Sequence, residues 1–197
     1  MNIESGDIIE KYRKCISTNN NNSYKYVLGL SIIQINPKNK IIKFNDIADK
    51  VVDIYFNNIF INKLIEHNKN QETRVQIDMK NYFDKYGLKK ELDKSNKEEI
   101  VKIIVNNRNN GFFKYVLPCF TGAKKGNNGN YIYPDVGCNE FFSYDINKQE
   151  IHLSENMMDI INKQYNLIKN ITVEEYSKYL KKKNNNKNNI DYILDEY

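Results

Sequence analysis

The chain has 197 residues but no tryptophan, only two histidines and only three cysteines. Cys15, Cys119 and Cys138 are odd in number, far apart and without a Cys-x-x-Cys pair, which argues against a disulfide framework or a zinc site. We therefore expect reduced thiols in a cytoplasmic protein. No stretch reaches about 18 consecutive apolar residues, so no membrane-spanning helix is expected. The acidic N-terminus, residues 1–7, lacks the basic and apolar parts of a secretory signal.

Alanine is also scarce, with two residues against 33 asparagines. This bias is typical of an AT-rich genome, so runs of asparagine and lysine carry little functional weight by themselves. Apolar residues make up 40% of the chain, charged residues 28%, and the mean hydropathy is −0.72. The composition is polar, yet it contains enough apolar residues to form the core of a single folded domain.

Apolar residues recur at helical spacing in several segments. The segment at 24–35 is apolar on most sides, which predicts a central, buried helix. Polar residues before several segments fit helix N-caps: Ser23, Asn45 or Asp46, Ser154, and the capping boxes that begin at Ser95 and Thr172. The predicted helices span about 5–17, 24–35, 46–66, 75–86, 96–108, 155–168 and 172–180, with a short helix at 190–197 left open.

Other segments favour extended structure or turns. Residues 41–44 fit a short extended piece, 112–117 a strand or buried extended segment, and 122–130 a loop. Residues 141–144 and 150–153 predict a β-hairpin. The fold class is therefore mainly α, a single multi-helix domain with one small β-hairpin in the C-terminal half, and α+β is the alternative. We assign 1–183 to the helical domain, with the hairpin near 141–153, and 184–197 to a polar tail rich in Lys and Asn.

The positive charge is concentrated in the middle of the chain. Residues 74–125 carry twelve basic and six acidic side chains, a net charge of +6, whereas the remainder carries −1. A basic region can bind phosphates by releasing counterions. The alternative is that these lysines merely solvate helix faces. The four lysines that we expect to contact nucleic acid are Lys89, Lys90, Lys124 and Lys125.

Residues with potential for chemistry are few. His67 and His152 stand in no metal-binding motif, and the sequence indicates no metal and no cofactor. The glycine-rich loop at 122–129 has the wrong spacing for a phosphate-binding P-loop, although its two lysines could touch a nucleic-acid backbone. We assign no catalytic residue. Most of the fifteen tyrosines and nine phenylalanines fall on apolar stripes and are expected in the core, with some left open as base-stacking residues.

Four carboxylates near the predicted hairpin provide the one enzyme hypothesis, a two-metal nuclease centre. They are Asp135, Glu140, Asp145 and Glu150. The Glu-x-Lys or Asp-x-Lys pattern that would complete such a centre does not follow them at the expected spacing. An enzyme would require a pocket that brings Asp135, Glu140 and Glu150 together with a lysine.

The order of several short motifs resembles the helical N-terminal region that precedes the nuclease module of bacterial restriction-like HNH endonucleases. The motifs are SYKYVLGL at 23–30, IIKFNDIA at 41–48, KYVLP at 114–118, FFSY at 141–144, EIHL at 150–153 and TVEEYSKYL at 172–180. The resemblance covers about residues 5–185. The Cys-x-x-Cys knuckle and the Asp-His pair of the HNH module are absent from the sequence, so the resemblance transfers no catalytic residue.

What the resemblance implies is a non-catalytic domain that contacts DNA through the basic 74–125 region, or that binds a separate or downstream nuclease module. The alternative is a protein-interaction or structural module with no nucleic-acid role. That alternative predicts a mixed-charge surface with an exposed apolar patch near residues 170–197.

Overall fold

The computed structural model describes residues 3–18, 22–67, 71–87, 92–107, 111–121, 124–125, 131–132, 134–185, 189–195 and 197. The helices are α1 (Ile3–Ser17), α2 (Tyr24–Ile35), α3 (Phe44–Tyr55), the π-helix η1 (Phe56–Ile61), α4 (Arg74–Tyr86), α5 (Lys94–Asn106), α6 (Phe112–Thr121), α7 (Glu155–Lys183) and α8 (Ile190–Asp195). The strands are β1 (Ile41–Lys43), β2 (Lys124–Lys125), β3 (Tyr131–Ile132), β4 (Val136–Cys138), β5 (Phe142–Asp145) and β6 (Glu150–Leu153). The mainly helical fold class is confirmed.

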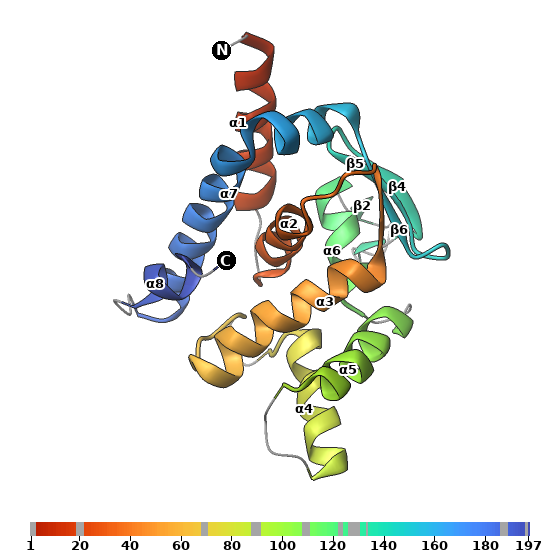
Figure 1. Ribbon diagram of the computed structural model, residues 1–197, viewed down its shortest axis with the longest axis vertical. Helices are drawn as coiled ribbons and strands as arrows, with labels where there is room; N and C mark the ends of the chain where they lie inside the picture. Colours follow the sequence, from red (N-terminus) through yellow and green to blue (C-terminus); the bar gives the residue numbers. More distant parts are fainter. Residues whose placement is uncertain are drawn as a thin grey trace.

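Helix α2 lies at the centre of the molecule and packs against α1, α3, α6 and α7 (Figure 1). Its side chains are buried continuously from Tyr24 to Ile33, as its all-round apolar pattern predicts. A helix without a polar face must be covered on every side. The burial of α2 therefore determines where the surrounding helices lie.

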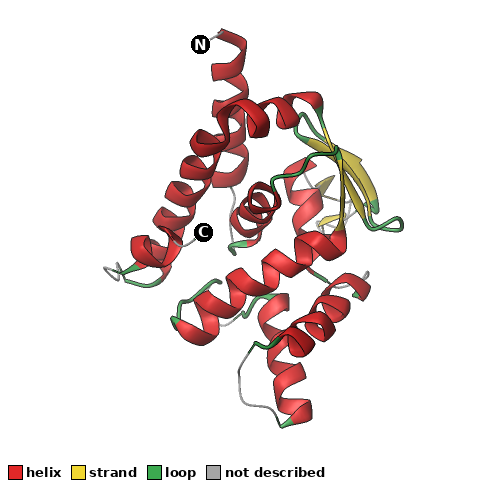
Figure 2. Cartoon of the chain, viewed as in Figure 1, coloured by secondary structure: helices red, strands yellow, loops and turns green. Residues whose placement is uncertain are grey.

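The predicted hairpin is confirmed as β5 and β6, and it belongs to a four-stranded antiparallel sheet of order β1-β6-β5-β4. The extended piece at 41–44 contributes β1, whose Ile42 pairs with Ile151. Ile42, Ile151 and Tyr144 are buried on the inner face of the sheet. The sheet stands at one side of the helical body (Figure 2), and its outer face carries the alternate, more polar residues.

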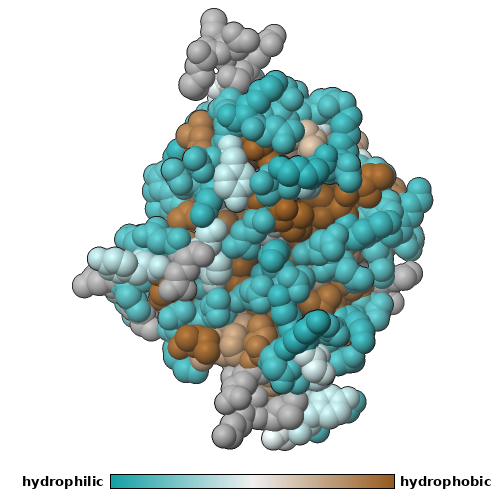
Figure 3. Space-filling model, viewed as in Figure 1, coloured by the Kyte–Doolittle hydropathy of each residue, from teal (hydrophilic) through white to brown (hydrophobic). Residues whose placement is uncertain are grey.

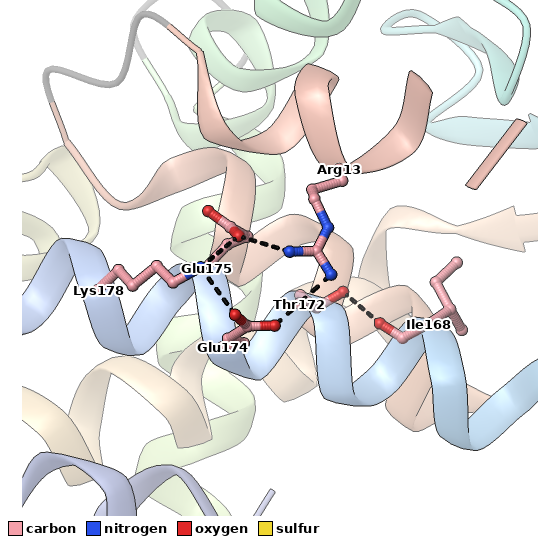
Figure 4. A network of polar contacts seen from close by, with 6 residues as sticks. All are labelled: Arg13, Ile168, Thr172, Glu174, Glu175 and Lys178. Atoms are coloured by element: carbon pink, nitrogen blue, oxygen red, sulfur yellow. Dashed lines mark hydrogen bonds and ion pairs between the residues drawn. The ribbon is translucent and has the colours of Figure 1, made fainter. Parts of the chain in front are cut away.

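Helix α1 is attached to α7 through polar contacts (Figure 4). The buried hydroxyl of Tyr12 lies 3.0 Å from Thr172 Oγ1, which itself donates to the carbonyl oxygen of Ile168 at 2.8 Å. Because the Thr172 proton is already engaged, Tyr12 is the donor in its contact with Thr172. At the surface, the Arg13 guanidinium donates to Glu175 Oε1 at 3.2 Å.

The prediction of extended structure at 112–117 is wrong, because this segment begins α6. Its buried residues are Phe112, Phe113, Val116, Leu117 and Phe120, a helical spacing. Pro118 lies inside the helix, where its ring nitrogen cannot donate the usual hydrogen bond. The aromatic residues together with Val116 resemble a strand signal, and Pro118 is unfavourable inside a helix, but burial against α2 favours the helix.

Several predicted helix boundaries are also wrong. The two helices expected at 155–168 and 172–180 form the single helix α7, with a kink at Gln164 (φ −136°, ψ 34°). Thr172 lies inside that helix and caps nothing. The long helix expected at 46–66 leaves α-helical geometry after Tyr55 and continues as η1. The short helix left open at 190–197 is present as α8.

The predicted N-caps have different outcomes, because only some of the polar side chains bond to the first turn of the helix that follows them. Ser154 caps α7 by accepting from the Met157 N–H at 3.1 Å, as predicted. Helix α5 begins before Ser95, because Asp93 accepts from the Asn96 N–H at 2.8 Å. Ser23 precedes α2 but makes no capping bond, since its hydroxyl bonds with Tyr55. Lys43, rather than Asn45 or Asp46, stands at the N-cap of α3.

Gly29 permits the close approach of α1 and α2. A Cβ atom at this position would lie 2.6 Å from the Tyr12 hydroxyl. We predict that Gly29→Ala lowers the free energy of unfolding by about 1–3 kcal/mol through overpacking, despite the higher helix propensity of alanine. Urea unfolding followed by circular dichroism measures the change.

The double variant Tyr12→Phe/Gly29→Ala is the control, because Tyr12→Phe removes the atom that the new Cβ meets. Tyr12→Phe leaves Thr172 bonded to Ile168. The effect of Gly29→Ala should therefore be smaller in the Tyr12→Phe background than in the wild type. Equal effects in both backgrounds would show that this close approach does not limit the packing.

Candidate functional site

Of the four predicted nucleic-acid-binding lysines, Lys89 and Lys90 lie outside the described residues, in the connection between α4 and α5. Lys124 and Lys125 form the short strand β2, which pairs with Ile132 and Tyr131 of β3. The structure describes the backbone of β2 but not the side chains of its lysines.

Most of the described basic side chains of the 74–125 region form ion pairs. Lys97, whose side chain is 20% exposed, lies 2.6 Å from Asp49 and 2.8 Å from Asp53 of α3. Several of the carboxylates lie outside 74–125, so folding neutralises part of the charge that the sequence concentrates there. The remaining pairs are Arg74–Asp78, Lys80–Glu72, Lys102–Glu99 and Lys114–Asp135.

The exceptions flank the connection between α4 and α5. Within the described part of 74–125, Lys85 and Lys94 are exposed and form no ion pair. Lys85 belongs to the last turn of α4 and Lys94 begins α5, so these two lysines bracket Lys89 and Lys90 in the sequence. Residues 85–94 contain four lysines against two acidic residues, one of which is Asp93. The Asp93 carboxylate is engaged as the N-cap of α5.

The four carboxylates of the nuclease hypothesis each contact a different lysine. Asp135 pairs with Lys114 at 2.5 Å, and Glu140 with Lys11 at 3.3 Å. Asp145 lies 3.8 Å from Lys148, and Glu150 pairs with Lys43. Among the described residues, no group of three or more His, Cys, Asp or Glu side chains is placed to hold a metal ion.

The outer face of the sheet brings His152 and Glu150 together. The His152 Nε2 atom lies 2.9 Å from Glu150 Oε2. Hydrogen bonds from Lys43 and His152 lower the pKa of the Glu150 carboxyl. The bond to the carboxylate orients the imidazole, whose side chain is 43% exposed.

A buried polar centre, which the sequence did not indicate, surrounds Glu66. This side chain is fully buried in the loop after η1. Its Oε1 atom accepts from Asn58 Nδ2 at 2.7 Å and from the Tyr176 hydroxyl at 2.6 Å. Its backbone oxygen accepts from the Tyr179 hydroxyl at 3.2 Å and from the Ser23 N–H at 3.2 Å. One residue thus joins the start of α2, the π-helix and α7.

The network continues from Asn58 toward the end of the chain. The Tyr197 hydroxyl lies 3.1 Å from Asn58 Oδ1 and 3.3 Å from the Ile54 carbonyl oxygen. Asn58 belongs to η1, and π-helical turns occur frequently at functional sites. Here the π-helix directs the Asn58 amide into the protein interior.

Burial is the dominant influence on the Glu66 carboxyl. Transfer out of water disfavours the carboxylate and raises the pKa above its ordinary value of 4.5, while hydrogen bonds from neighbouring groups lower it only in part. The second oxygen, Oε2, has no hydrogen-bond partner among the described residues. The Glu66 centre fastens three segments together around a buried carboxyl whose pKa is raised.

Among the described residues of 170–197, exposed apolar side chains do not form the expected patch. Leu167 and Tyr192 are 40% and 77% exposed. Helix α8 lies beside Ser177, which donates to Asp191 at 2.6 Å, and Ser177 is about 15 Å along α7 from Leu167. On the face drawn in Figure 3, hydrophobic surface appears in separate areas divided by hydrophilic residues. No described helix is both long and apolar enough to cross a membrane.

Comparison of the chain with protein-family models, curated proteins and solved structures gives no match. The resemblance to the N-terminal region of HNH endonucleases therefore stays a hypothesis, and the residues themselves carry the functional argument.

The raised pKa of the Glu66 carboxyl makes a pH prediction. The unfolded chain releases the carboxyl proton near pH 4.5, whereas the folded protein releases it at higher pH. The Glu66 contribution should therefore decline as pH rises above 4.5 through the folded pKa, with a slope of up to about 1.4 kcal/mol per pH unit. Glu66→Gln mimics the protonated acid and should remove this slope, which urea unfolding between about pH 4 and pH 8 measures.

Glu150→Gln is the control. The pKa of Glu150 is lowered, so its contribution is lost as pH falls rather than as it rises. Parallel pH profiles for the wild type and Glu66→Gln would show that the interior does not hold this proton.

Proposed function

We propose that this protein is a non-catalytic nucleic-acid-associated domain that contacts the phosphate backbone at the connection between α4 and α5. The observation that carries the proposal is the distribution of charge. Five described basic residues of the 74–125 region are neutralised by ion pairs, whereas the described lysines Lys85 and Lys94, which flank this connection, are not. Lysines outside ion pairs can exchange counterions for phosphates without breaking an ion pair of the fold.

The position of α4 and α5 in the molecule also favours the connection between them as the contact site. In Figure 1, α4 and α5 lie on the side of α3 away from α2, and the C-terminal end of α4 stands at one end of the molecule. Helix α5 packs against α3, and Lys97 joins the two helices through Asp49 and Asp53. The helices on either side of the connection are therefore anchored in the body of the protein. Lysines on anchored helices keep fixed positions along a bound polyanion.

The proposal retains the cytoplasm as the compartment, on the ground that three widely spaced cysteines suit a reducing environment. It also retains a separate or downstream nuclease module as a partner, on the ground of the motif order that resembles HNH endonucleases. Lys124 and Lys125 remain candidate contacts on sequence grounds alone.

We predict that Lys89→Glu/Lys90→Glu weakens binding to a fluorescein-labelled duplex, because reversed charges repel phosphates. The slope of log affinity against log salt should become shallower by about 0.9 for each phosphate that the variant no longer neutralises. Fluorescence anisotropy over a series of salt concentrations measures both quantities. Lys124→Glu/Lys125→Glu, measured in the same way, tests the second pair of lysines.

Lys169→Glu/Lys182→Glu is the matched control, since it makes the same charge change on α7. It should alter the affinity less than the Lys89→Glu/Lys90→Glu variant does. The proposal fails if the wild type does not bind at low salt, if its salt slope is flat, or if the control variant loses as much affinity.

A second candidate is a protein-interaction module, and the exposed isoleucines at the end of η1 favour it. Ile61 and Ile65, four residues apart, are 58% and 45% exposed. If they form an interface between two copies, Ile61→Ser/Ile65→Ser should convert a dimer into a monomer in sedimentation velocity. A wild type that stays monomeric at all concentrations would argue against this candidate.

A further inference from the structure

The end of α4 presents an aromatic ring to solvent. Tyr86 is the last residue of the helix and is 56% exposed. Gly87 follows in the left-handed conformation (φ 58°), which ends the helix, and a Cβ placed on Gly87 would meet no described atom within 4 Å.

The Tyr86 ring contacts a second aromatic ring on the same helix. Tyr82, one helical turn earlier, has its ring centroid 5.0 Å from that of Tyr86. The Tyr82 hydroxyl donates to Asn96 Oδ1 of α5 at 3.3 Å, and its ring packs edge-on against the buried Phe83. An anchored ring loses little conformational freedom when a ligand stacks on it.

The Lys85 side chain places a positive charge beside the Tyr86 ring. The Lys85 ammonium lies 5.0 Å from the Tyr86 ring centroid, within the range of a cation–π contact. Asp93 and Glu99, two acidic residues near Tyr82, are already engaged, since Asp93 caps α5 and Glu99 lies 2.5 Å from Lys102. The surface thus combines an exposed aromatic ring with the ammonium of Lys85, beside the exposed carboxylate of Asp84.

We propose that Tyr86, supported by Tyr82 and accompanied by Lys85, is a stacking platform for an unpaired base of single-stranded nucleic acid. This inference rests on the proposed function and specifies its ligand. Stacking requires a free base face, which a single strand offers and an intact duplex withholds. The platform binds the base, and Lys85 attracts the adjacent phosphate. DNA and RNA share this chemistry, so the test includes both.

The absence of tryptophan makes a site-specific test available. Tyr86→Trp introduces the one tryptophan of the chain, so indole emission reports from the platform alone. Addition of a mixed-sequence single strand of about 20 nucleotides, long enough for one binding site, should quench this emission. Tyr192→Trp is the matched control, because Tyr192 is 77% exposed on α8, away from the platform. Quenching that is equal at both positions would overturn the proposal.

Affinities measured by anisotropy complete the test. Tyr86→Ala should weaken binding of single-stranded DNA or RNA about 5- to 150-fold, the range expected for loss of one stacked base, and Tyr86→Trp should restore it. Tyr192→Ala should have no such effect. An abasic strand of equal length keeps the phosphates but lacks bases, so it should bind the wild type and Tyr86→Ala equally. Thermal melting confirms that the variants are folded.

The outcomes separate the two proposals. If Tyr86→Ala binds the single strand as the wild type does, or the abasic strand binds the wild type as tightly as the normal strand, the stacking platform is refuted. The proposed function still stands in that case if Lys89→Glu/Lys90→Glu weakens duplex binding. If the wild type binds neither strand nor duplex at low salt, both proposals fail.

Discussion

The burial of α2 on all sides is the constraint on which the rest of the structure depends. A helix with no polar face cannot lie at the surface, so α1, α3, α6 and α7 must cover it. The cover is tight enough that Gly29 allows the Tyr12 hydroxyl to lie where a Cβ would clash. The small sheet and the α4–α5 pair are attached to this body rather than forming its centre.

The Glu66 centre is the polar consequence of the same packing. Where α2 begins, its covering segments meet, and their polar groups must find partners away from water. Glu66 receives bonds from Asn58 and Tyr176, while its own backbone oxygen satisfies Ser23 and Tyr179. Removal from water disfavours the charged form of the carboxyl, which raises its pKa. The centre stabilises one arrangement of the segments.

Ion pairing distinguishes the basic residues of the 74–125 region from one another. Lys97 and Lys114 are neutralised by carboxylates from neighbouring elements. At the end of α4 and the start of α5, Lys85 and Lys94 are not neutralised by any described carboxylate, and the Tyr86 ring is exposed. Both proposals follow from this contrast. Ion pairing and burial determine which side chains remain available to a ligand.

Periodicity alone predicted the elements whose burial is continuous or strongly one-sided, such as α2, the hairpin of β5 and β6, and the cap of α7 at Ser154. It failed at α6, where the aromatic residues resembled a strand, and at Thr172, whose hydroxyl accepts from the distant Tyr12 instead of capping a helix. For the candidate site, the sequence located the basic region but not which of its lysines are paired, because Asp49, Asp53 and Asp135 are distant in the chain.

The sequence by itself determined the helical class, the central helix and the position of the positive charge, because these depend on local composition and spacing. Only the tertiary structure decided that Glu66 is buried beside Asn58 and Tyr176, and that Tyr86 stays exposed above Tyr82. The burial of Glu66 depends on a contact with Tyr176, 110 residues away in the chain. The exposure of Tyr86 depends on which described segments cover the end of α4. Neither is encoded in the pattern of neighbouring residues.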